Sequence, residues 1–322
     1  MTTTESSQSP AGPMDQFAGG ILVPLDGSCI AEQAVPVAGT IAHRTGRGVH
    51  LGSVLHRAIS VLAATPEEPT PDAGLEAELR QQFTEYLESS AEALETTHGV
   101  EVNYALLEGV AAPALADYAR LKRISLIVMT THGHSGIHRL WLGSVADRLL
   151  RRVKAPVLLL RPLNGSLQTE FRRVLIALDG LVEGEKILEP AIELGSLSPD
   201  CQFTLVQVVE PPVSLITRMA MHPATMRPHW RELQENSARS YLERVASRMR
   251  ARGLHVDTRM ISERGIGEQI LALAKSIGTD LLVVGTHGAQ GIERMLLGSV
   301  ADKVVRGSSG PVLVVPTRKE NE

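Results

Sequence analysis

The sequence predicts a duplicated α/β fold, in which each half of the chain forms a parallel sheet with helices on both faces. Residues 131–151 and 286–306 are identical at 13 of 21 positions, which indicates an internal repeat. Short apolar runs alternate with segments of helical periodicity in both halves. These runs lack the polar alternation of half-exposed strands, as is typical of strands that are covered on both faces.

The repeat extends beyond this one stretch. "GGILVPLDGS" at 19–28 matches "RRVLIALDGL" at 172–181, and "APVLLLRP" at 155–162 matches "GPVLVVPT" at 310–317. A nearly constant offset over so much of the chain indicates duplication of a whole domain rather than a short solenoid repeat.

The domain boundaries follow from the repeat and from local composition. We expect a first domain over 19–163 and a second over 170–317, joined by a segment in which Pro, Asn, Gly and Ser cluster. Residues 1–18 are rich in Ser, Thr and Pro and are expected to form a disordered tail.

Each half is expected to contain the same elements in the same order. A first strand precedes an Ala-rich helix, over about 30–45 in one half and 184–196 in the other. A second strand leads into a long helix, over about 75–98 or 229–252. A third strand, a helix, a fourth strand, the repeated loop, another helix and a last strand complete each half.

Composition excludes several classes of function. The net charge is −4 and aromatic residues make up 3% of the chain, so neither a nucleic-acid surface nor a base-stacking platform is expected. No apolar run is long enough to span a membrane, and the first residues do not resemble a signal peptide. The two cysteines, Cys29 and Cys201, form no Cys-x-x-Cys pair, which fits a reducing cytoplasm.

The loop after the fourth strand has features of a phosphate site. In the second half, the strand "LLVVG" ends at Gly285, and a helix is expected to begin at Gly298 and Ser299. The first amides of a helix lack internal partners, and with the helix dipole they favour an anion. Gly288, Gly298, Ser299 and Val300 are therefore candidates for holding phosphate through the backbone at the carboxyl end of a strand.

A structural explanation of the same residues stays open. The glycines would then close a tight turn, and Ser299 would cap a helix. Asp26 and Asp179 end the first strand of each half and should lie at the same sheet edge as the loop, where a carboxylate can accept hydrogen bonds from ribose hydroxyls. An Asp-Gly pair after a strand is, however, also typical of a turn.

Other common motifs are missing from the sequence. The loop has no Gly-Lys-Ser/Thr, so it is not a Walker A loop, and no Gly-x-Gly-x-x-Gly follows the first strand. "GHSGI" does not fit the Gly-x-Ser-x-Gly pattern of hydrolases.

The spacing Gly-x2-Gly-x9-Gly-Ser, followed by "VADKVVRGSSGPVLVV", resembles the ATP-binding signature of the universal stress protein family. The resemblance covers nearly the whole chain as two tandem copies. It implies a Rossmann-like fold of five parallel strands per copy, and binding of adenine nucleotide, namely ATP with Mg²⁺. The implied contacts in the first domain are Pro24, Asp26, Val54, Thr130, Gly133, Gly143, Ser144 and Val145. Those in the second domain are Ala177, Asp179, Val208, Gly285, Gly288, Gly298, Ser299 and Val300.

The two copies depart from the family pattern at different positions. The first has Thr130 in place of the first glycine, where a β-branched side chain would crowd the ribose. The second has Ala177 in place of Pro24, and Leu181 in place of Ser28, so it lacks a hydroxyl beside the aspartate. We therefore expect weaker binding in the first domain.

The resemblance also implies pairing through the last strand. Family members commonly dimerise in this way, and the tandem chain is expected to pair 156–160 with 311–315 internally, as a pseudo-dimer. Burying these apolar edge strands against each other would prevent aggregation. Further association into a homodimer remains an alternative.

Several other residues have an ordinary explanation beside a functional one. His132, His134 and His138 are candidate metal ligands or turn histidines, and Cys29 is a candidate redox thiol or an incidental one. Arg139 and Arg294 either reach phosphates or lie in solvent. The Met-rich stretch at 213–230 is a lid, core filling or a partner surface.

The function expected from these observations is nucleotide-dependent regulation of a stress response rather than catalysis. The sequence shows no dedicated base, phosphate lysine or Walker B carboxylate. A slow ATPase or a nucleotidyl-transfer enzyme, and a scaffold with vestigial sites, are the alternatives.

Overall fold

The computed structural model describes residues 19–55, 73–131, 142–161, 169–210, 227–286 and 297–317. The expected tail at 1–18 lies outside these residues, as do the histidine cluster, Arg139, Arg294 and most of the Met-rich stretch. No helix in the described part of the chain has the length and apolar character needed to cross a membrane.

The first domain has five strands and five helices in its described part. The strands are β1 (Ile21–Pro24), β2 (Val49–Leu55), β3 (Val102–Glu108), β4 (Leu126–Thr130) and β5 (Val157–Leu160). The helices are α1 (Cys29–Glu32), α2 (Ala34–Thr45), α4 (Ala73–His98), α5 (Ala111–Leu121) and α6 (Ser144–Leu150).

The second domain repeats this order. Its strands are β6 (Arg173–Ala177), β7 (Gln202–Val208), β8 (His255–Ile261), β9 (Leu281–Gly285) and β10 (Val312–Val315). Its helices are the 3-10 helix η2 (Glu183–Ile187), then α7 (Leu188–Ser196), α9 (Arg227–Arg250), α10 (Ile266–Ser276) and α11 (Ser299–Gly307).

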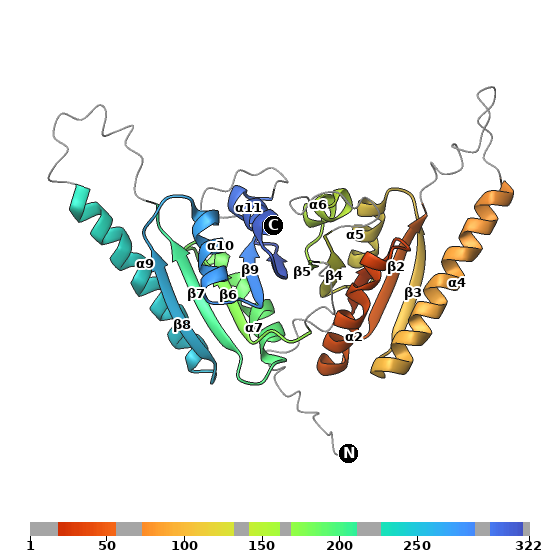
Figure 1. Ribbon diagram of the computed structural model, residues 1–322, viewed down its shortest axis with the longest axis horizontal. Helices are drawn as coiled ribbons and strands as arrows, with labels where there is room; N and C mark the ends of the chain where they lie inside the picture. The colour runs from red at the N-terminus through yellow and green to blue at the C-terminus, as the bar shows by residue number, and fades with distance from the viewer. Residues whose placement is uncertain are drawn as a thin grey trace, which may run out of the picture.

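All ten strands join in one sheet with the order β3-β2-β1-β4-β5-β10-β9-β6-β7-β8. The five strands of each domain run parallel, whereas β5 and β10 pair antiparallel at the centre, with Leu158 opposite Leu313. The expected pairing of the last strands within the chain is therefore observed. Figure 1 shows the result, with α4 and α9 on the two outer flanks and α6 and α11 toward the middle.

The helices cover both faces of the sheet, as the continuously apolar strands predict. One core cluster contains α2, α4, α7 and α9 with Leu158 and Leu313, and the other contains α5, α6, α10 and α11 with Leu159 and Val312. Each domain is thus an α/β layer structure, and both cores continue across the junction between the domains.

The first helix of each domain, expected as one element over about 30–45 or 184–196, is interrupted. Pro36 and Pro190 lie in the first turns of α2 and α7. Because proline has no amide hydrogen, it cannot donate to the carbonyl four residues earlier, so a helix tends to restart there. A short turn, α1 or η2, precedes the main helix in each domain as a result.

Polar contacts add to the central strand pair. Arg44 on α2 donates to the carbonyl of Leu197 (2.5 Å) and pairs with Glu170 (3.0 Å) in the other domain. Arg47 pairs with Glu193 on α7. The two domains are therefore joined through α2 and α7 as well as through β5 and β10.

Candidate functional site

The junctions before α6 and α11 have nearly the same backbone geometry. Gly143 has φ −56° and ψ 146°, and Gly298 has φ −57° and ψ 150°. The amide of Gly143 donates to the carbonyl of Thr131, and that of Gly298 donates to the carbonyl of Thr286, both at 2.8 Å. Both helices thus leave their loop in the same way.

The expected start of each helix is observed, whereas the alternative in which Ser299 caps the helix is not. Gly298 is the N-cap residue of α11 and Ser299 is its first helical residue, with no side-chain cap to the helix. Gly143 and Ser144 take the same places in α6. Because each N-cap residue is a glycine, it has no side chain to accept from the first amides, and such amides favour an anion.

Gly143 also has a purely steric reason to be glycine. A Cβ atom at this position would lie 2.9 Å from the carbonyl oxygen of Thr131. The close approach of two backbone segments therefore excludes a side chain here whether or not a ligand is bound.

The aspartates lie at the same sheet edge as these junctions. Leu22 is level with Ile127 in the β1–β4 register, and Val174 is level with Leu281 in the β6–β9 register. Continuing these registers places Asp26 beside Thr131 and Asp179 beside Thr286. Each domain therefore brings an acidic residue and a helix start together at the carboxyl ends of parallel strands, where open α/β sheets bind ligands.

Asp26 takes part in a local turn that leads into α1. Its carboxylate accepts from the amide (3.0 Å) and the hydroxyl (2.6 Å) of Ser28. The hydroxyl of Ser28 in turn accepts from the amide of Ala31 at 3.2 Å and caps the helix. Asp26 is exposed, so its carboxylate remains accessible to solvent at the sheet edge.

Asp179 has a more enclosed environment in the second domain. Its carboxylate accepts from the amide of Leu181 (2.9 Å), and it packs so closely on η2 that Gly184 has no room for a Cβ. Burial raises the pKa of Asp179, and the negative charge of Glu183 raises it further, while the amide of Leu181 acts in the opposite direction. The second domain therefore has a half-buried carboxylate at Asp179, next to a leucine that has no hydroxyl to donate to it.

The remaining described candidates surround this edge. Pro24 and Ala177 end β1 and β6, and Val54 and Val208 lie in the neighbouring strands. Four valines and one alanine pack partly buried against the α5, α6, α10 and α11 cluster: Val54, Val145, Ala177, Val208 and Val300. The positions of these five side chains are therefore fixed by packing against the core next to the candidate site. Gly133 and Gly288 lie outside the described residues.

Thr130 and Gly285 occupy equivalent ends of β4 and β9. The side chain of Thr130 is almost fully buried, at 7% exposure. A Cβ at Gly285 would lie 2.9 Å from Cγ2 of Thr317, which explains why the second domain has glycine there. This difference between the copies therefore has a packing reason.

Sequence reasoning missed two tyrosines that reach the aspartate turns from the long helices. Tyr86 on α4 and Tyr241 on α9 are separated by the repeat offset of 155 residues, which is the signal that points to them. The hydroxyl of Tyr241 donates to the carbonyl of Leu181 at 3.3 Å. Burial raises both tyrosine pKa values, and the negative charges of Asp26 and Asp179 act in the same direction.

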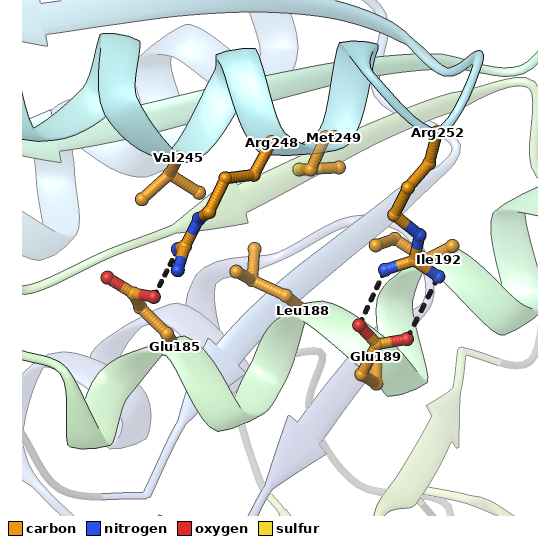
Figure 2. A pocket seen from close by; sticks show the side chains of 8 residues that line it. All are labelled: Glu185, Leu188, Glu189, Ile192, Val245, Arg248, Met249 and Arg252. Carbon is orange, nitrogen blue, oxygen red and sulfur yellow. Dashed lines mark hydrogen bonds and ion pairs between the residues drawn. The ribbon is translucent and has the colours of Figure 1, made fainter. Parts of the chain in front are cut away.

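A cavity of about 330 Å³ lies between η2, α7 and α9 in the second domain. Figure 2 shows two ion pairs bridging it, Arg248 with Glu185, and Arg252 with Glu189 at 2.6 and 3.1 Å. The apolar lining is already buried, with exposures of 0–8%, in Leu188, Ile192, Val245 and Met249. This cavity lies on the sheet face opposite α11 and is separate from the candidate nucleotide site.

The described residues contain no group of three or more His, Cys, Asp or Glu side chains placed to hold a metal ion. His132, His134 and His138 lie outside the described residues. The described part of the site therefore consists of backbone amides and one carboxylate per domain.

Known proteins match the chain with the same duplicated pattern. The sequence matches the universal stress protein family over residues 19–161 and again over 170–316. A universal stress protein of Mycolicibacterium smegmatis is 26% identical over 303 residues, covering 93% of this chain and 97% of that protein. One from Mycobacterium tuberculosis is 26% identical over 305 residues, covering 92% and 96%.

Among solved structures, a universal stress protein from Archaeoglobus fulgidus shares the fold, with a TM-score of 0.67 and 19% identity. The match covers 95% of this chain and 98% of that one, so the likeness includes both domains. The chain belongs to the universal stress protein family, with two of the family's domains in tandem.

Proposed function

We propose that this protein binds ATP at the carboxyl edge of each domain's sheet, and that nucleotide occupancy serves as a regulatory state in a stress response. The amides at the start of α6 and α11 would hold the phosphates. Asp26 and Asp179 would accept hydrogen bonds from the ribose, and the neighbouring strand residues Val54 and Val208 would lie toward the adenine.

The observation that carries this proposal is the matched geometry of the two junctions. Gly143 and Gly298 share their backbone angles and their hydrogen bond to a threonine carbonyl, as the repeated sequence around them predicts. In both domains an aspartate is placed at the same edge. Within each domain, the carboxylate and the start of the helix meet at the carboxyl ends of parallel strands, which is where open α/β sheets bind ligands.

Mg²⁺ fits this site as a companion of the phosphates. Mg²⁺ retains several waters and commonly needs only one or two carboxylates together with phosphate oxygens. Because the described residues offer no cluster of metal ligands, the ion would depend on the nucleotide rather than bind first. Its chemistry would be to neutralise phosphate charge.

Binding without rapid turnover is part of the proposal. Phosphoryl transfer needs a group that orients the attacking nucleophile and cations that stabilise the transition state. In the described structure the aspartates accept hydrogen bonds within their own turns, from Ser28 and Leu181, and would bind ribose rather than activate a nucleophile. Incubation with ATP and Mg²⁺ should therefore yield less than about one ADP per site per minute, a rate far below ordinary turnover; multiple turnovers per minute would favour the slow ATPase.

The binding test uses equivalent substitutions in both domains. Asp179→Ala should weaken ATP binding in the second domain by about 1–3 kcal/mol, through loss of hydrogen bonds to a charged acceptor. Gly298→Val should abolish most binding there, because a branched side chain blocks the approach of phosphate to the backbone. Asp26→Ala and Gly143→Val are the matched variants in the first domain. Isothermal titration calorimetry gives affinity and stoichiometry for each.

Two results would reject the proposal. One is a wild-type protein whose melting temperature does not change in millimolar ATP, since a ligand of the folded state must stabilise it. The other is unchanged affinity in all four variants. Either result would favour a scaffold with vestigial sites.

A further inference from the structure

Arg161 belongs to the first domain but contacts the end of a second-domain helix. We propose that it is a positioning residue for the nucleotide site of the second domain. It would act through α11, without touching the nucleotide. This inference rests on the proposed function and deepens it, because it makes one of the two sites depend on the pairing of the domains.

The contact is direct and buried. Arg161 follows β5 immediately and is 8% exposed. Its Nη2 donates to the carbonyl of Val305 and, at 3.1 Å, to that of Arg306. These two carbonyls belong to the last turn of α11, which ends at Gly307.

A guanidinium is well suited to this position. The last four carbonyls of a helix have no partners within the helix, and the helix dipole makes this end negative. Burial lowers the pKa of Arg161, and its Nε is buried without a partner among the described residues. The hydrogen bonds to the end of α11 thus offset part of the cost of removing this charge from water, and they add to the apolar packing that holds the helix.

The other end of the same helix carries the proposed phosphate donors. Helix α11 has only nine residues, so its two ends move together as one rigid element. Gly298 and Ser299 open the helix, and Arg161 contacts it about two turns further on. A shift at the carboxyl end therefore displaces the amides that would hold phosphate.

Among the described residues, no contact from the second domain to the end of α6 matches that of Arg161. The residue equivalent to Arg161 in the repeat is Pro316, which has no side-chain donor and cannot cap α6. The pseudo-symmetric chain is thus asymmetric here. The second site depends on a first-domain side chain, whereas the first site receives no such contact from Pro316.

The test compares Arg161→Met with Arg161→Lys in the full chain. Amide hydrogen exchange should become about 10-fold faster in α11 of Arg161→Met, consistent with loss of a partly buried cation at a helix end. Exchange in α6 should not change. Arg161→Lys, which keeps the charge but not the planar fork, should show an intermediate increase in α11.

Nucleotide binding supplies the readout that a merely structural role would not change. In a Gly143→Val background, which leaves the second site, Arg161→Met should weaken ATP binding about 10-fold. In a Gly298→Val background, which leaves the first site, it should have no effect. Arg44→Met is the control, because Arg44 also bridges the domains but lies at α2 and α7, away from α11.

The outcomes separate this inference from the proposed function. Failure of the wild-type protein to bind ATP rejects the proposed function and with it the role in binding, while the exchange measurement still decides whether Arg161 holds α11. Unchanged exchange in α11, equal weakening of both sites, or an equal effect of Arg44→Met would overturn the role of Arg161. If Arg161→Met does not fold, Arg161→Lys carries the same comparison.

Discussion

The two domains share a sheet plan but differ in how their outer helices meet. In the first domain, α2 packs tightly against α4, and the position where a Cβ would stand on Gly39 is 2.6 Å from Leu94 and 2.7 Å from His98. In the second domain the equivalent of Gly39 is Ile192, and α7 approaches α9 less closely. The second domain thus has the four-carbon side chain of Ile192 where Gly39 has only a hydrogen, and α7 and α9 are further apart than α2 and α4.

Charged side chains bridge the space between α7 and α9 in the second domain. Arg248 and Arg252 cross from α9 to Glu185 and Glu189, above a floor of buried apolar residues (Figure 2). Exposed ion pairs of this kind contribute only about 0–1 kcal/mol each, so the apolar floor supplies most of the stabilisation. Duplication thus preserved the sheet and the strand-to-helix junctions, while the outer helices pack differently in the two domains.

The same contrast appears at the aspartate turns. Asp26 is exposed and bound to a serine hydroxyl, whereas Asp179 is half-buried beside Leu181 and η2. The nucleotide sites proposed for the two domains therefore differ in electrostatics although their backbones agree.

Disrupting the strand pair that joins the two domains should reduce the stability of the protein most. Leu159→Asp places a charge in the central strand pair, where Leu159 lies opposite Val312 at 1% exposure. A buried charge without a partner should cost more than about 4 kcal/mol and expose apolar surface. Urea denaturation and binding of a hydrophobic dye measure both effects.

The control for that variant is Leu121→Asp, since Leu121 is 76% exposed. It should change stability by less than about 0.5 kcal/mol. A Leu159→Asp protein that stays compact and binds no dye would contradict the role of the β5–β10 pair.

A smaller effect is expected from placing the second domain's residue in the first. Gly39→Ile inserts a side chain against Leu94 and should destabilise the protein by about 1–3 kcal/mol through overpacking. Adding Leu94→Ala removes the nearest atoms and should restore part of the loss, which a double-mutant cycle measures. If the losses of stability in the two single variants simply add in the double variant, then the close packing of α2 on α4 does not depend on the contact between positions 39 and 94.

The smallest effect concerns the pH dependence of the second aspartate turn. Burial raises the folded-state pKa of Asp179 above its ordinary value of 3.8, so the folded state binds this proton more tightly than the unfolded chain. Its contribution to stability is full below the ordinary pKa and is lost as pH rises through the folded pKa. Asp179→Asn should therefore gain stability relative to wild type as pH rises from 3.5 to 7, by less than about 1 kcal/mol.

Urea denaturation across this pH range checks the sign, with Asp26→Asn as the control for removing an exposed carboxylate from the equivalent turn. A difference between wild type and Asp179→Asn that stays constant with pH would show that burial of Asp179 has no influence on stability.

Much of the fold could be predicted because its signals are local and occur twice. The apolar runs place the strands, and the matched segments around Asp26 and Asp179 place equivalent elements. The start of α11 at Ser299 was predicted from Gly298. The alternative of a cap by Ser299 could not be decided from the sequence, because the type of residue does not show which one adopts the first helical angles.

The tyrosines were missed for a different reason. Tyr86 and Tyr241 lie far from the aspartates in sequence and approach them only when a long helix packs across the sheet. The repeat offset could have identified them as a pair, but not as neighbours of the turns.

From the chain alone, one can establish a twofold α/β plan, because hydrophobic periodicity and repetition are encoded residue by residue. The strand pair that joins the two halves was expected only from the resemblance to the family. Only folding determines that Arg161 reaches the end of α11 and that Ile192 lines a cavity beside α9. Folding likewise makes Asp179 half-buried and leaves Asp26 exposed. These features depend on contacts between segments distant in sequence, where side-chain volume, burial and the loss of solvent act together.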